Sequence, residues 1–287
     1  MRIMLTGAFG QLGHSLTNVL NKKHDLILTG REIPASKKGI KLNIQNKIHL
    51  NEIIQSTEPD IIINLAAMTN VDDCEVNPTL AREINIAGVQ NIIESFSGKI
   101  IQISTDYVFD GKNGPYSESD EVSPVSIYGQ TKLNAEKILL ENNNNHLIIR
   151  GNVLYDYNPY IKSSFLNWVI QSLQNGNEIN VANDIFNNPT WSRSMADIIK
   201  ICLSNDINGI LHWGDKDYIS RYDFAKIISE KFSLKSSLIK PISSSELGLI
   251  ASRPLNSGLI SEKAIKLLNV LQPSIDDCLN EILQKKI

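Results

Sequence analysis

The chain begins with RIMLTGAFGQLG, residues 2–13, and this stretch already indicates a fold class. Residues Arg2–Thr6 form a short apolar run, and the glycines after it lead into a helical pattern of apolar residues (Leu12, Leu16, Val19 and Leu20). The order is therefore strand, glycine turn, helix. Gly7 permits a tight turn, Gly10 lets the backbone approach a pyrophosphate, and Gly13 lets helix and strand pack closely. Because a helix N-terminus attracts anions, we predict a dinucleotide site at this turn.

The alternation of strands and helices continues through the first half of the chain. Near-continuous apolar runs, typical of parallel strands buried on both faces, recur at 25–29, 60–65, 99–104 and 146–150, with helical stretches between them. This pattern predicts an α/β fold, a Rossmann-type doubly wound parallel sheet whose ligands bind at the carboxyl ends of the strands. The residues that follow the strands are candidates for the site: Gly30-Arg31, Ala66-Ala67-Met68, Thr105-Asp106-Tyr107 and Arg150-Gly151-Asn152-Val153.

Beyond residue 150 the alternation loosens. Helices are expected at 164–174, 195–203, 223–232, 261–268 and 276–284, and strands at 179–182 and 209–213. We expect residues 1–150 to form a dinucleotide-binding Rossmann domain, and residues 151–287 a smaller mixed α/β lobe that is interwoven with it and binds the substrate. Four consecutive asparagines at 142–145 are typical of a solvated turn.

Tyr128 and Lys132 lie four residues apart in the sequence YGQTK. On a helix this spacing places both side chains on one face, one turn apart. Ser123-Pro124 has the form of an N-cap followed by proline at the first helical position. A tyrosine with its usual pKa of about 10 is a poor acid–base catalyst, and a nearby lysine favours the phenolate and lowers that pKa. A bound oxidised nicotinamide would add a second positive charge. By itself, the pair is more typical of an amphipathic surface helix than of a catalytic site, and the rest of the chain has to support the catalytic role.

Composition excludes several classes of function. The 287 residues are 42% hydrophobic and 21% charged, as in an ordinary globular protein. The net charge of -3, without a basic block, argues against a nucleic-acid partner. No apolar run approaches the roughly 18 residues of a membrane span, and the N-terminal run is too short for a signal peptide. Three distant cysteines and five histidines without metal-ligand spacing predict no metal site and a reduced, cytoplasmic protein.

The end of the second strand bears on the choice of cofactor. An acidic residue roughly 20 positions beyond the glycines would bind the ribose 2′-hydroxyl and select NAD. Here the strand ends at Gly30-Arg31-Glu32. Because Arg31 can pair with a 2′-phosphate, we predict NADP as the cofactor, with NADPH preferred. The adjacent Glu32 leaves room for NADH as well.

These motifs together resemble the extended short-chain dehydrogenase/reductase family. The resemblance rests on four motifs: Gly7-x-x-Gly10-x-x-Gly13, Asn64-Leu65-Ala66-Ala67, STDYVFDG at 104–111, and Tyr128-x-x-x-Lys132. More closely, the chain resembles the dTDP-4-dehydrorhamnose reductases through TNVD at 69–72, PYSESD at 115–120, NPT at 188–190 and RPLNSGL at 253–259. The resemblance covers nearly the whole chain. It implies an NAD(P)H-dependent oxidoreductase of dTDP-rhamnose and polysaccharide biosynthesis that reduces a nucleotide-linked 4-keto-6-deoxysugar, and it is compatible with a homodimer.

The resemblance also implies roles for individual residues. Thr105 would polarise the substrate carbonyl, Tyr128 would donate the proton, and Lys132 would bind the nicotinamide ribose and lower the tyrosine pKa. The implied cofactor-binding residues are Gly7, Phe9, Gly10, Gln11, Leu12, Gly13, Arg31, Asn43, Ile44, Ala66, Ala67, Met68, Tyr128 and Lys132. Asn43 stands where relatives carry an adenine-contacting Asp. The implied substrate-binding residues are Thr105, Asp106, Tyr107, Asn152 and Arg253.

Other members of the family leave alternatives open. Its sugar-nucleotide dehydratases carry Asp-Glu after the threonine, whereas this chain has Asp106-Tyr107, which favours ketone reduction over dehydration or epimerisation. Val153 replaces the tryptophan usual in the rhamnose branch, so the sugar is not determined. HWG at 212–214 and SRY at 220–222 also resemble the regulatory beta subunit of methionine adenosyltransferase, which binds the cofactor without catalysis.

Several of these residues also have a structural explanation. Arg253 is either a surface charge or a contact to phosphate or sugar, and Asp72 is a candidate helix cap. Trp191 and Trp213 are expected in the core. His212 has no partner that the sequence shows, and a structural role is expected for it.

Overall fold

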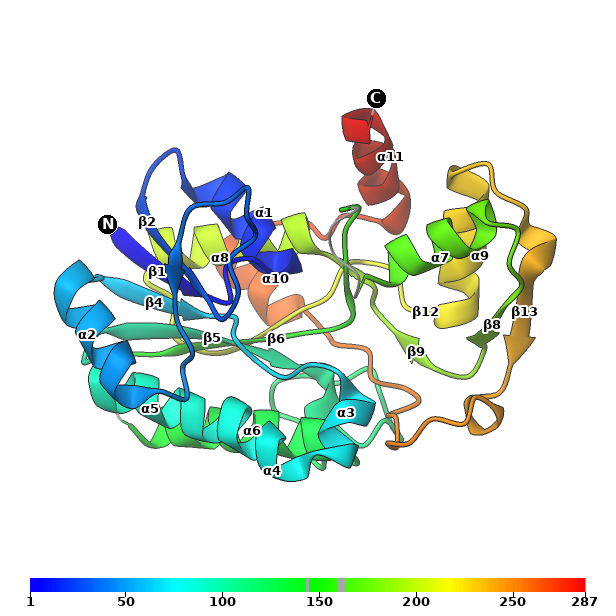
Figure 1. The fold of residues 1–287 in the computed structure, drawn as a ribbon. Helices are drawn as coiled ribbons and strands as arrows, with labels where there is room; N and C mark the ends of the chain where they lie inside the picture. Colours follow the sequence, from blue (N-terminus) through cyan, green and yellow to red (C-terminus); the bar gives the residue numbers. More distant parts are fainter. Residues whose placement is uncertain (143–144, 159–163, 287) are drawn as a thin grey trace.

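A computed structural model describes residues 1–142, 145–158 and 164–286 of the chain (Figure 1). The predicted asparagine turn lies partly outside the described residues. A central sheet of seven parallel strands has the order β11-β6-β5-β4-β1-β2-β3. Its strands are β1 (Arg2–Thr6), β2 (Asp25–Gly30), β3 (Ile40–Lys41), β4 (Ile61–Asn64), β5 (Lys99–Thr105), β6 (Leu147–Gly151) and β11 (Gly209–Trp213). The predicted doubly wound parallel sheet is confirmed.

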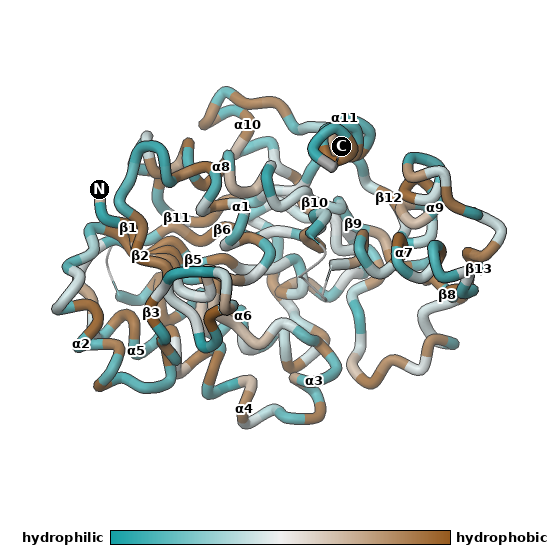
Figure 2. The backbone as a smooth tube through the Cα atoms, turned by 45° about the horizontal axis from the view of Figure 1, so that its top comes forward, coloured by the Kyte–Doolittle hydropathy of each residue, from teal (hydrophilic) through white to brown (hydrophobic). Residues whose placement is uncertain are grey.

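Helices cover both faces of this sheet. One layer contains α1 (Gln11–Leu20), α8 (Ser192–Ser204) and α10 (Glu262–Leu268), and the other contains α2 (Lys47–Thr57), α5 (Gly88–Ser95) and α6 (Ile127–Glu141). Alternate residues of β1 serve the two layers: Ile3 and Leu5 pack with the first, and Met4 packs with the second. This period of two explains why the strands read as continuous apolar runs, which appear brown in the middle of Figure 2.

A second lobe lies beside the carboxyl ends of the strands (Figure 1). Its strands β8 (Ile179–Ala182) and β13 (Ile239–Ile242) pair in parallel, and α7 (Phe165–Gln174) and α9 (Arg221–Lys231) pack beside them. The C-terminal helix α11 (Ile275–Lys286) completes its apolar core. Two short ladders join the lobe to the sheet edge, β7 (Leu154–Tyr155) with β10 (Thr190–Trp191) and β9 (Phe186–Asn187) with β12 (Ile219–Ser220).

The chain crosses back to the sheet after residue 150. Strand β11 pairs with β6 over its whole length, and α8 packs on α1 in the main core. The strand predicted at 209–213 is therefore correct in its bounds, but it lies in the central sheet and not in the second lobe. The physical reason is that β11 covers the edge of β6, which would otherwise expose unpaired backbone groups.

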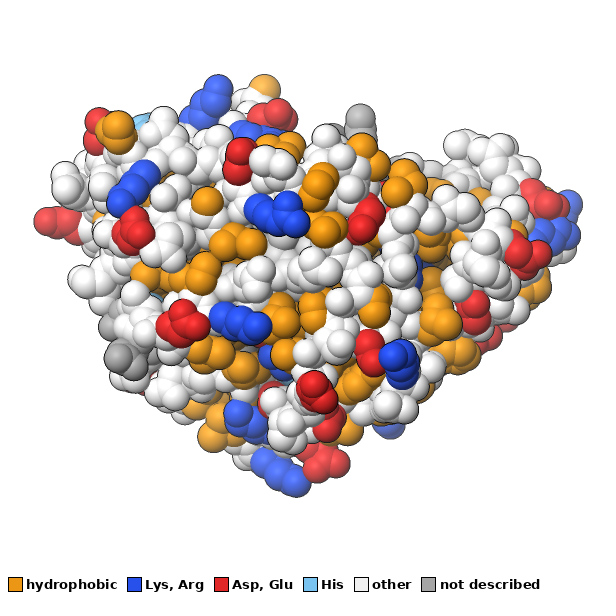
Figure 3. Space-filling view, turned by 90° about the horizontal axis from the view of Figure 1, so that it is seen from below, with side chains coloured by type: hydrophobic (Ala, Val, Ile, Leu, Met, Phe, Trp, Pro, Cys, Tyr) orange, Lys and Arg blue, Asp and Glu red, His pale blue; other side chains and the backbone are white. Residues whose placement is uncertain are grey.

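The remaining elements are short. They are α3 (Val71–Val76), α4 (Pro78–Arg82), the π-helical turn η1 (Glu83–Ala87) and the 3-10 turns η2 (Asp106–Val108), η3 (Ser236–Leu238) and η4 (Ser244–Glu246). Figure 3 shows the underside of the molecule, where positive and negative side chains are interspersed with apolar ones. Among the described residues, no helix has the length and apolar character needed to cross a bilayer.

Candidate active site

The three glycines of the first turn differ in the space that a Cβ atom would find. Gly7 has a φ of +64°, and a Cβ there would lie 2.9 Å from the backbone nitrogen of Ala66. A Cβ at Gly13 would lie 2.4 Å from the carbonyl oxygen of Ala8. At Gly10 the nearest atom would be 3.5 Å away, an ordinary contact. The polypeptide therefore requires glycine at positions 7 and 13, whereas the space beside Gly10 is left open.

This open space lies at the start of α1. Gly10 is the N-cap, no side chain caps the helix, and its first turn contains no acidic residue. A cavity of about 380 Å³ runs from here to the end of β2, lined by Gly7, Phe9, Gly10, Gly30, Arg31, Glu32, Ile33 and Pro34. The ring of Phe9 lies against Gly30 and Gly39 and forms one wall. The amide groups of the helix start and the exposed Arg31 suit the phosphates of a dinucleotide.

The other predicted cofactor residues lie around the same edge with different orientations. Leu12 and Ile44 are buried in the two cores, so only their backbone could meet a cofactor. Asn43 is exposed, and its side-chain oxygen accepts the backbone N–H of Gln45. The buried side-chain oxygen of Gln11 has no hydrogen-bond partner in the described chain. Ala66, Ala67 and Met68 are half-buried after β4, next to the glycine turn.

Helix α6 carries Tyr128 and Lys132 and starts later than predicted. Its N-cap is Ser126, whose hydroxyl accepts the N–H of Gly129 at 3.2 Å, so the predicted cap at Ser123-Pro124 is wrong. Pro124 instead packs beside Gly129. A Cβ at Gly129 would lie 2.1 Å from the carbonyl oxygen of Tyr107. Glycine inside this helix is therefore what lets α6 approach the turn after β5.

This approach brings the three predicted catalytic residues together. Thr105 ends β5, its hydroxyl donates to Asp106 Oδ1 at 3.0 Å, and its side chain is close enough to Tyr128 to oppose the rise in the phenol pKa. Lys132 is buried, and its ammonium donates to the carbonyl oxygen of Ile103 at 2.6 Å. The arrangement puts a hydroxyl, a phenol and an ammonium at the carboxyl end of the middle of the sheet.

The pKa values of this group follow mainly from burial. Burial raises the pKa of Tyr128 above its usual value, and the nearby Asp106 adds to the rise. Burial also lowers the pKa of Lys132 to about 8, with the Glu136 carboxylate opposing it. In the polypeptide by itself, desolvation of the phenolate therefore dominates the pKa of Tyr128, and the lowering by Lys132 together with a bound nicotinamide stays a prediction.

A buried ion pair between Glu136 and Arg150 ties α6 to β6. Glu136, one turn beyond Lys132, accepts from Arg150 Nη2 at 2.7 Å and from Arg150 Nε at 3.0 Å, and it also accepts from the Ser104 hydroxyl. His212, for which no partner was expected, contacts Arg150 Nη1 at 3.3 Å and the Tyr116 carbonyl oxygen at 3.1 Å. Burial and Arg150 lower the pKa of His212 to about 3, so it is neutral and structural.

On the substrate side, the loop of residues 251–259 docks on the turn after β5. The Ser257 hydroxyl donates to Asp106 Oδ2 at 2.5 Å, and Asn152 Nδ2 donates to the Ser257 carbonyl oxygen at 2.9 Å. Burial raises the pKa of Asp106, although these hydrogen bonds oppose the rise. Asp106 and Asn152 are thus brought to the site but are engaged in holding this loop.

Arg253 and Asp72 form an ion pair with each other. Arg253 Nη2 lies 3.0 Å from Asp72 Oδ2, and Asp72 also accepts the backbone N–H of Ala251. The cap of α3 is Asn70, which accepts from Asp72 and Asp73, so the expected capping role of Asp72 is wrong. Trp191 and Trp213 are buried, as predicted.

Sequence reasoning missed several residues that build the site. The side chain of Asn85, in the π-helical turn η1, accepts the N–H of Met68 at 2.8 Å and donates to the Met68 carbonyl oxygen and to Thr131. It thereby ties the loop after β4 to α6. Gly129, Glu136 and Ser257 act in the same way, through contacts between distant segments. A glycine inside a predicted helix was the one visible signal among them.

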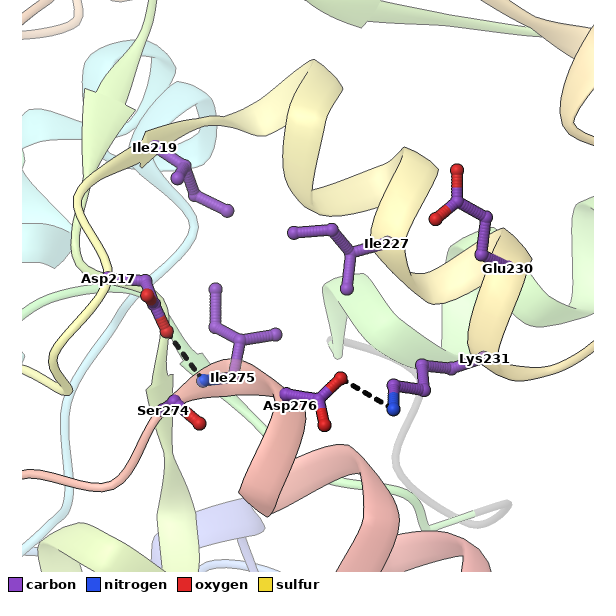
Figure 4. Close-up of a pocket in the computed structure, with 8 residues that line it drawn as sticks. All are labelled: Asp217, Ile219, Ile227, Glu230, Lys231, Ser274, Ile275 and Asp276. Atoms are coloured by element: carbon purple, nitrogen blue, oxygen red, sulfur yellow. Dashed lines mark hydrogen bonds and ion pairs between the residues drawn. The ribbon is translucent and has the colours of Figure 1, made fainter.

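Another cavity, of about 410 Å³, lies away from this group. It is lined by Asp217, Ile219, Ile227, Glu230, Lys231, Ser274, Ile275 and Asp276, between α9 and the start of α11 (Figure 4). Two interactions tie its polar groups together: Lys231 pairs with Asp276 at 2.5 Å, and the Asp217 carboxylate accepts the N–H of Ile275 at 2.6 Å. It shares no residue with the predicted site.

The fold and the site define the class of protein: a Rossmann-type dinucleotide-binding chain with the threonine, tyrosine and lysine of the extended short-chain dehydrogenase/reductases. More narrowly, the chain belongs to the family described as RmlD substrate binding domain, which matches residues 1–287.

Individual relatives agree with this assignment. The dTDP-4-dehydrorhamnose reductase of Aggregatibacter actinomycetemcomitans is 32% identical over 288 residues, covering 95% of each chain. Methionine adenosyltransferase 2 subunit beta of Rattus norvegicus is 30% identical over 273 residues, covering 91% of this chain and 81% of the relative. The crystal structure of Bacillus anthracis dTDP-4-dehydrorhamnose reductase, in complex with NADP, superposes with a TM-score of 0.90 at 29% identity, covering 99% of each chain.

Proposed function

We propose that the protein is an NADPH-dependent reductase of a nucleotide-linked 4-keto-6-deoxysugar. The observation that carries the proposal is the meeting of Thr105, Tyr128 and Lys132 at the same edge of the sheet as the glycine turn. The similarity to dTDP-4-dehydrorhamnose reductases, one of them crystallised with NADP, supports the substrate class and the cofactor.

The residues divide the reaction between them. When bound, NADPH supplies a hydride to the carbonyl carbon. The Thr105 hydroxyl and the Tyr128 phenol would hold the carbonyl oxygen, and Tyr128 would give it a proton as negative charge develops. The raised pKa of Tyr128 keeps the phenol protonated for that step. Lys132 holds a positive charge on the same face of α6 and would contact the cofactor ribose.

The turn after Thr105 favours reduction over dehydration. A dehydratase needs a further acid and base to remove a proton and expel hydroxide. Asp106 is buried and accepts from Ser257 and Thr105, and the next position holds the phenol of Tyr107, whose pKa is raised by burial. Asp106 is therefore engaged in hydrogen bonds, and Tyr107 stands where a dehydratase would have its second carboxylate. Simple ketone reduction fits this turn better than dehydration.

The test is a panel of nucleotide-linked 4-keto-6-deoxysugars incubated with NADPH, with loss of NADPH absorbance as the readout. We expect stoichiometric NADPH consumption with at least one of them. In a parallel assay, a 4-hydroxy nucleotide hexose with catalytic NADP should give no 4-keto-6-deoxy product. Formation of that product without net cofactor turnover would show a dehydratase instead.

A second function has specific support in the similarity to methionine adenosyltransferase 2 subunit beta. If neither assay shows turnover and NADP binds tightly, the regulatory role becomes the better proposal. Co-purification with a methionine adenosyltransferase would then be the deciding experiment.

We extend the proposal to location and assembly. Three free, buried cysteines suit a reducing, cytoplasmic compartment. A homodimer is proposed as the assembly, with the exposed apolar residues Val76 and Leu80 near α3 and α4 as candidates for its contact surface. Light scattering of wild type and of a Val76→Asp, Leu80→Asp double variant would test it.

A further inference from the structure

One cation at the junction of the two lobes has no role so far. Arg221 is the first residue of α9, held in place by its backbone N–H, which donates to the Ile185 carbonyl oxygen at 3.1 Å. Its guanidinium reaches Tyr107, with Nη2 3.5 Å from the phenol oxygen. The side chain is half-buried, and its Nε is buried without a hydrogen-bond partner in the described residues.

Arg221 and Arg253 both place positive charge near Tyr107, but their own surroundings differ. Positive charge from each opposes the burial that raises the pKa of Tyr107. Arg253, however, is neutralised by Asp72 at 3.0 Å. No carboxylate of the described chain lies within ion-pair distance of Arg221. The positive charge of Arg221 opposes the rise in the pKa of the buried Asp106, but that carboxyl lies beyond ion-pair distance. A half-buried guanidinium with an unused donor and no carboxylate within ion-pair distance is costly unless an anion arrives to complete it.

The position of this cation relative to the chemistry is set by Tyr107. The ring of Tyr107 meets the ring of Tyr128 edge-on, with centroids 5.6 Å apart, while its hydroxyl faces Arg221. The side chain of Tyr107 therefore lies between Arg221 and the ring of the proton donor, and contacts both. A hexose ring is comparable in length to a tyrosine side chain, and in a nucleotide-linked 4-keto sugar the diphosphate is attached across the ring from the carbonyl.

We propose that Arg221 is a substrate-binding residue that pairs with the diphosphate of the nucleotide sugar while the ketone lies at Thr105 and Tyr128. The inference rests on the proposed function for the class of substrate. A guanidinium presents several N–H donors in a plane and binds phosphate oxygens in a bidentate way, which a lysine cannot do. Binding would supply the partner that Nε lacks and an anion within ion-pair distance of the guanidinium.

The experiment separates binding of the diphosphate from turnover. The full-length protein is first saturated with NADP, so that the dinucleotide site is filled. Binding of thymidine diphosphate and of thymidine is then measured by calorimetry. In Arg221→Ala, affinity for thymidine diphosphate should fall roughly 10- to 100-fold, the scale of a charge-assisted hydrogen-bonded pair, while affinity for thymidine and NADP stays unchanged. In steady state, KM for the keto sugar should rise with little change in kcat.

Three controls keep the result interpretable. Arg82→Ala removes the same charge from an exposed position on α4 and should leave both affinities unchanged. Arg221→Lys keeps the charge but loses the fork, so it should recover part of the lost affinity. Tyr107→Phe removes the hydroxyl contact to Arg221 but keeps the guanidinium, so affinity for thymidine diphosphate should fall clearly less than in Arg221→Ala.

The opposite outcomes are equally specific. If Arg221→Ala weakens thymidine and thymidine diphosphate equally, or if Tyr107→Phe reproduces its full effect, Arg221 only supports the turn after β5 and the proposal is overturned. Because calorimetry needs no turnover, loss of the diphosphate effect is distinguishable from failure of the proposed reductase activity.

Discussion

The two ends of the site are built in opposite ways. At the cofactor end, a contiguous glycine turn and the neighbouring end of β2 leave backbone and open space, with little side-chain structure between them. At the substrate end, side chains from the turn after β5, from the loop of residues 251–259 and from α9 bind one another across long stretches of sequence. The cofactor end therefore depends on glycines whose missing Cβ atoms leave room for a ligand. The substrate end depends on hydrogen bonds between its own side chains. Substitutions should therefore act differently at the two ends.

The largest effect is expected where the two ends meet. Tyr128→Phe should lower turnover about 10²- to 10⁴-fold, because it removes the proton donor without changing the volume of the side chain. Binding of NADPH, followed by fluorescence titration, should be unchanged. Turnover near that of wild type would remove Tyr128 from the mechanism.

At the cofactor end, Arg31→Ala should separate the two nicotinamide cofactors. Affinity for NADPH should fall roughly 10- to 100-fold, because a charged contact to the 2′-phosphate is lost, while affinity for NADH should change little. Titrations with both cofactors measure this. An equal loss for the two would mean that Arg31 does not contact a 2′-phosphate.

The glycines of the first turn offer a matched pair within that end. Gly13→Ala forces a Cβ to within 2.4 Å of the Ala8 carbonyl oxygen and should cost about 1–3 kcal/mol in the free energy of unfolding. Gly10→Ala meets only an ordinary contact, so stability should stay near wild type while NADPH affinity falls. Denaturant unfolding and cofactor titration of both variants test this. A Gly10→Ala protein as unstable as Gly13→Ala would contradict the distinction.

Lys132, which lies between the two ends, should make the free energy of unfolding depend on pH. Its pKa is lowered from 10.5 to about 8, so between these pH values the unfolded state binds more protons than the folded state. The lysine therefore contributes a free energy of unfolding that rises with pH in this window, by at most about 1.4 kcal/mol per pH unit. In Lys132→Met that contribution should vanish. Identical pH profiles for the two proteins would contradict a buried, shifted lysine.

The smallest effect is expected from the contact that joins the substrate loop to the turn after β5. Ser257→Ala removes one hydrogen bond to Asp106, which keeps the bond from Thr105, so the free energy of unfolding should fall by about 1 kcal/mol. KM for the keto sugar should rise, while NADPH affinity stays constant. Ser257→Thr, which retains the hydroxyl, serves as the control. A fall in NADPH affinity instead would show that the two ends are coupled.

The difference between the two ends also explains how far the sequence could be interpreted. The strands at 2–6, 179–182 and 209–213 were predicted to the residue, and the roles of Gly7 and Gly13 followed from local spacing. By contrast, the start of α6 was placed at Ser123 and not at Ser126, because two serines near a proline are equivalent until packing selects one.

Neighbours along the chain fix the strand periodicity, the glycine turn and the spacing of Tyr128 and Lys132, and these features could be predicted before folding was considered. Features that depend on neighbours in space emerged from the folded structure. It placed β11 in the central sheet, gave Glu136 and His212 their partner in Arg150, and left the Nε of Arg221 without a hydrogen-bond partner among the described residues. The physical reason is that backbone propensity and side-chain period act over a few residues. The desolvation of a charge and the partner that compensates it are set by whatever segments the fold brings into contact.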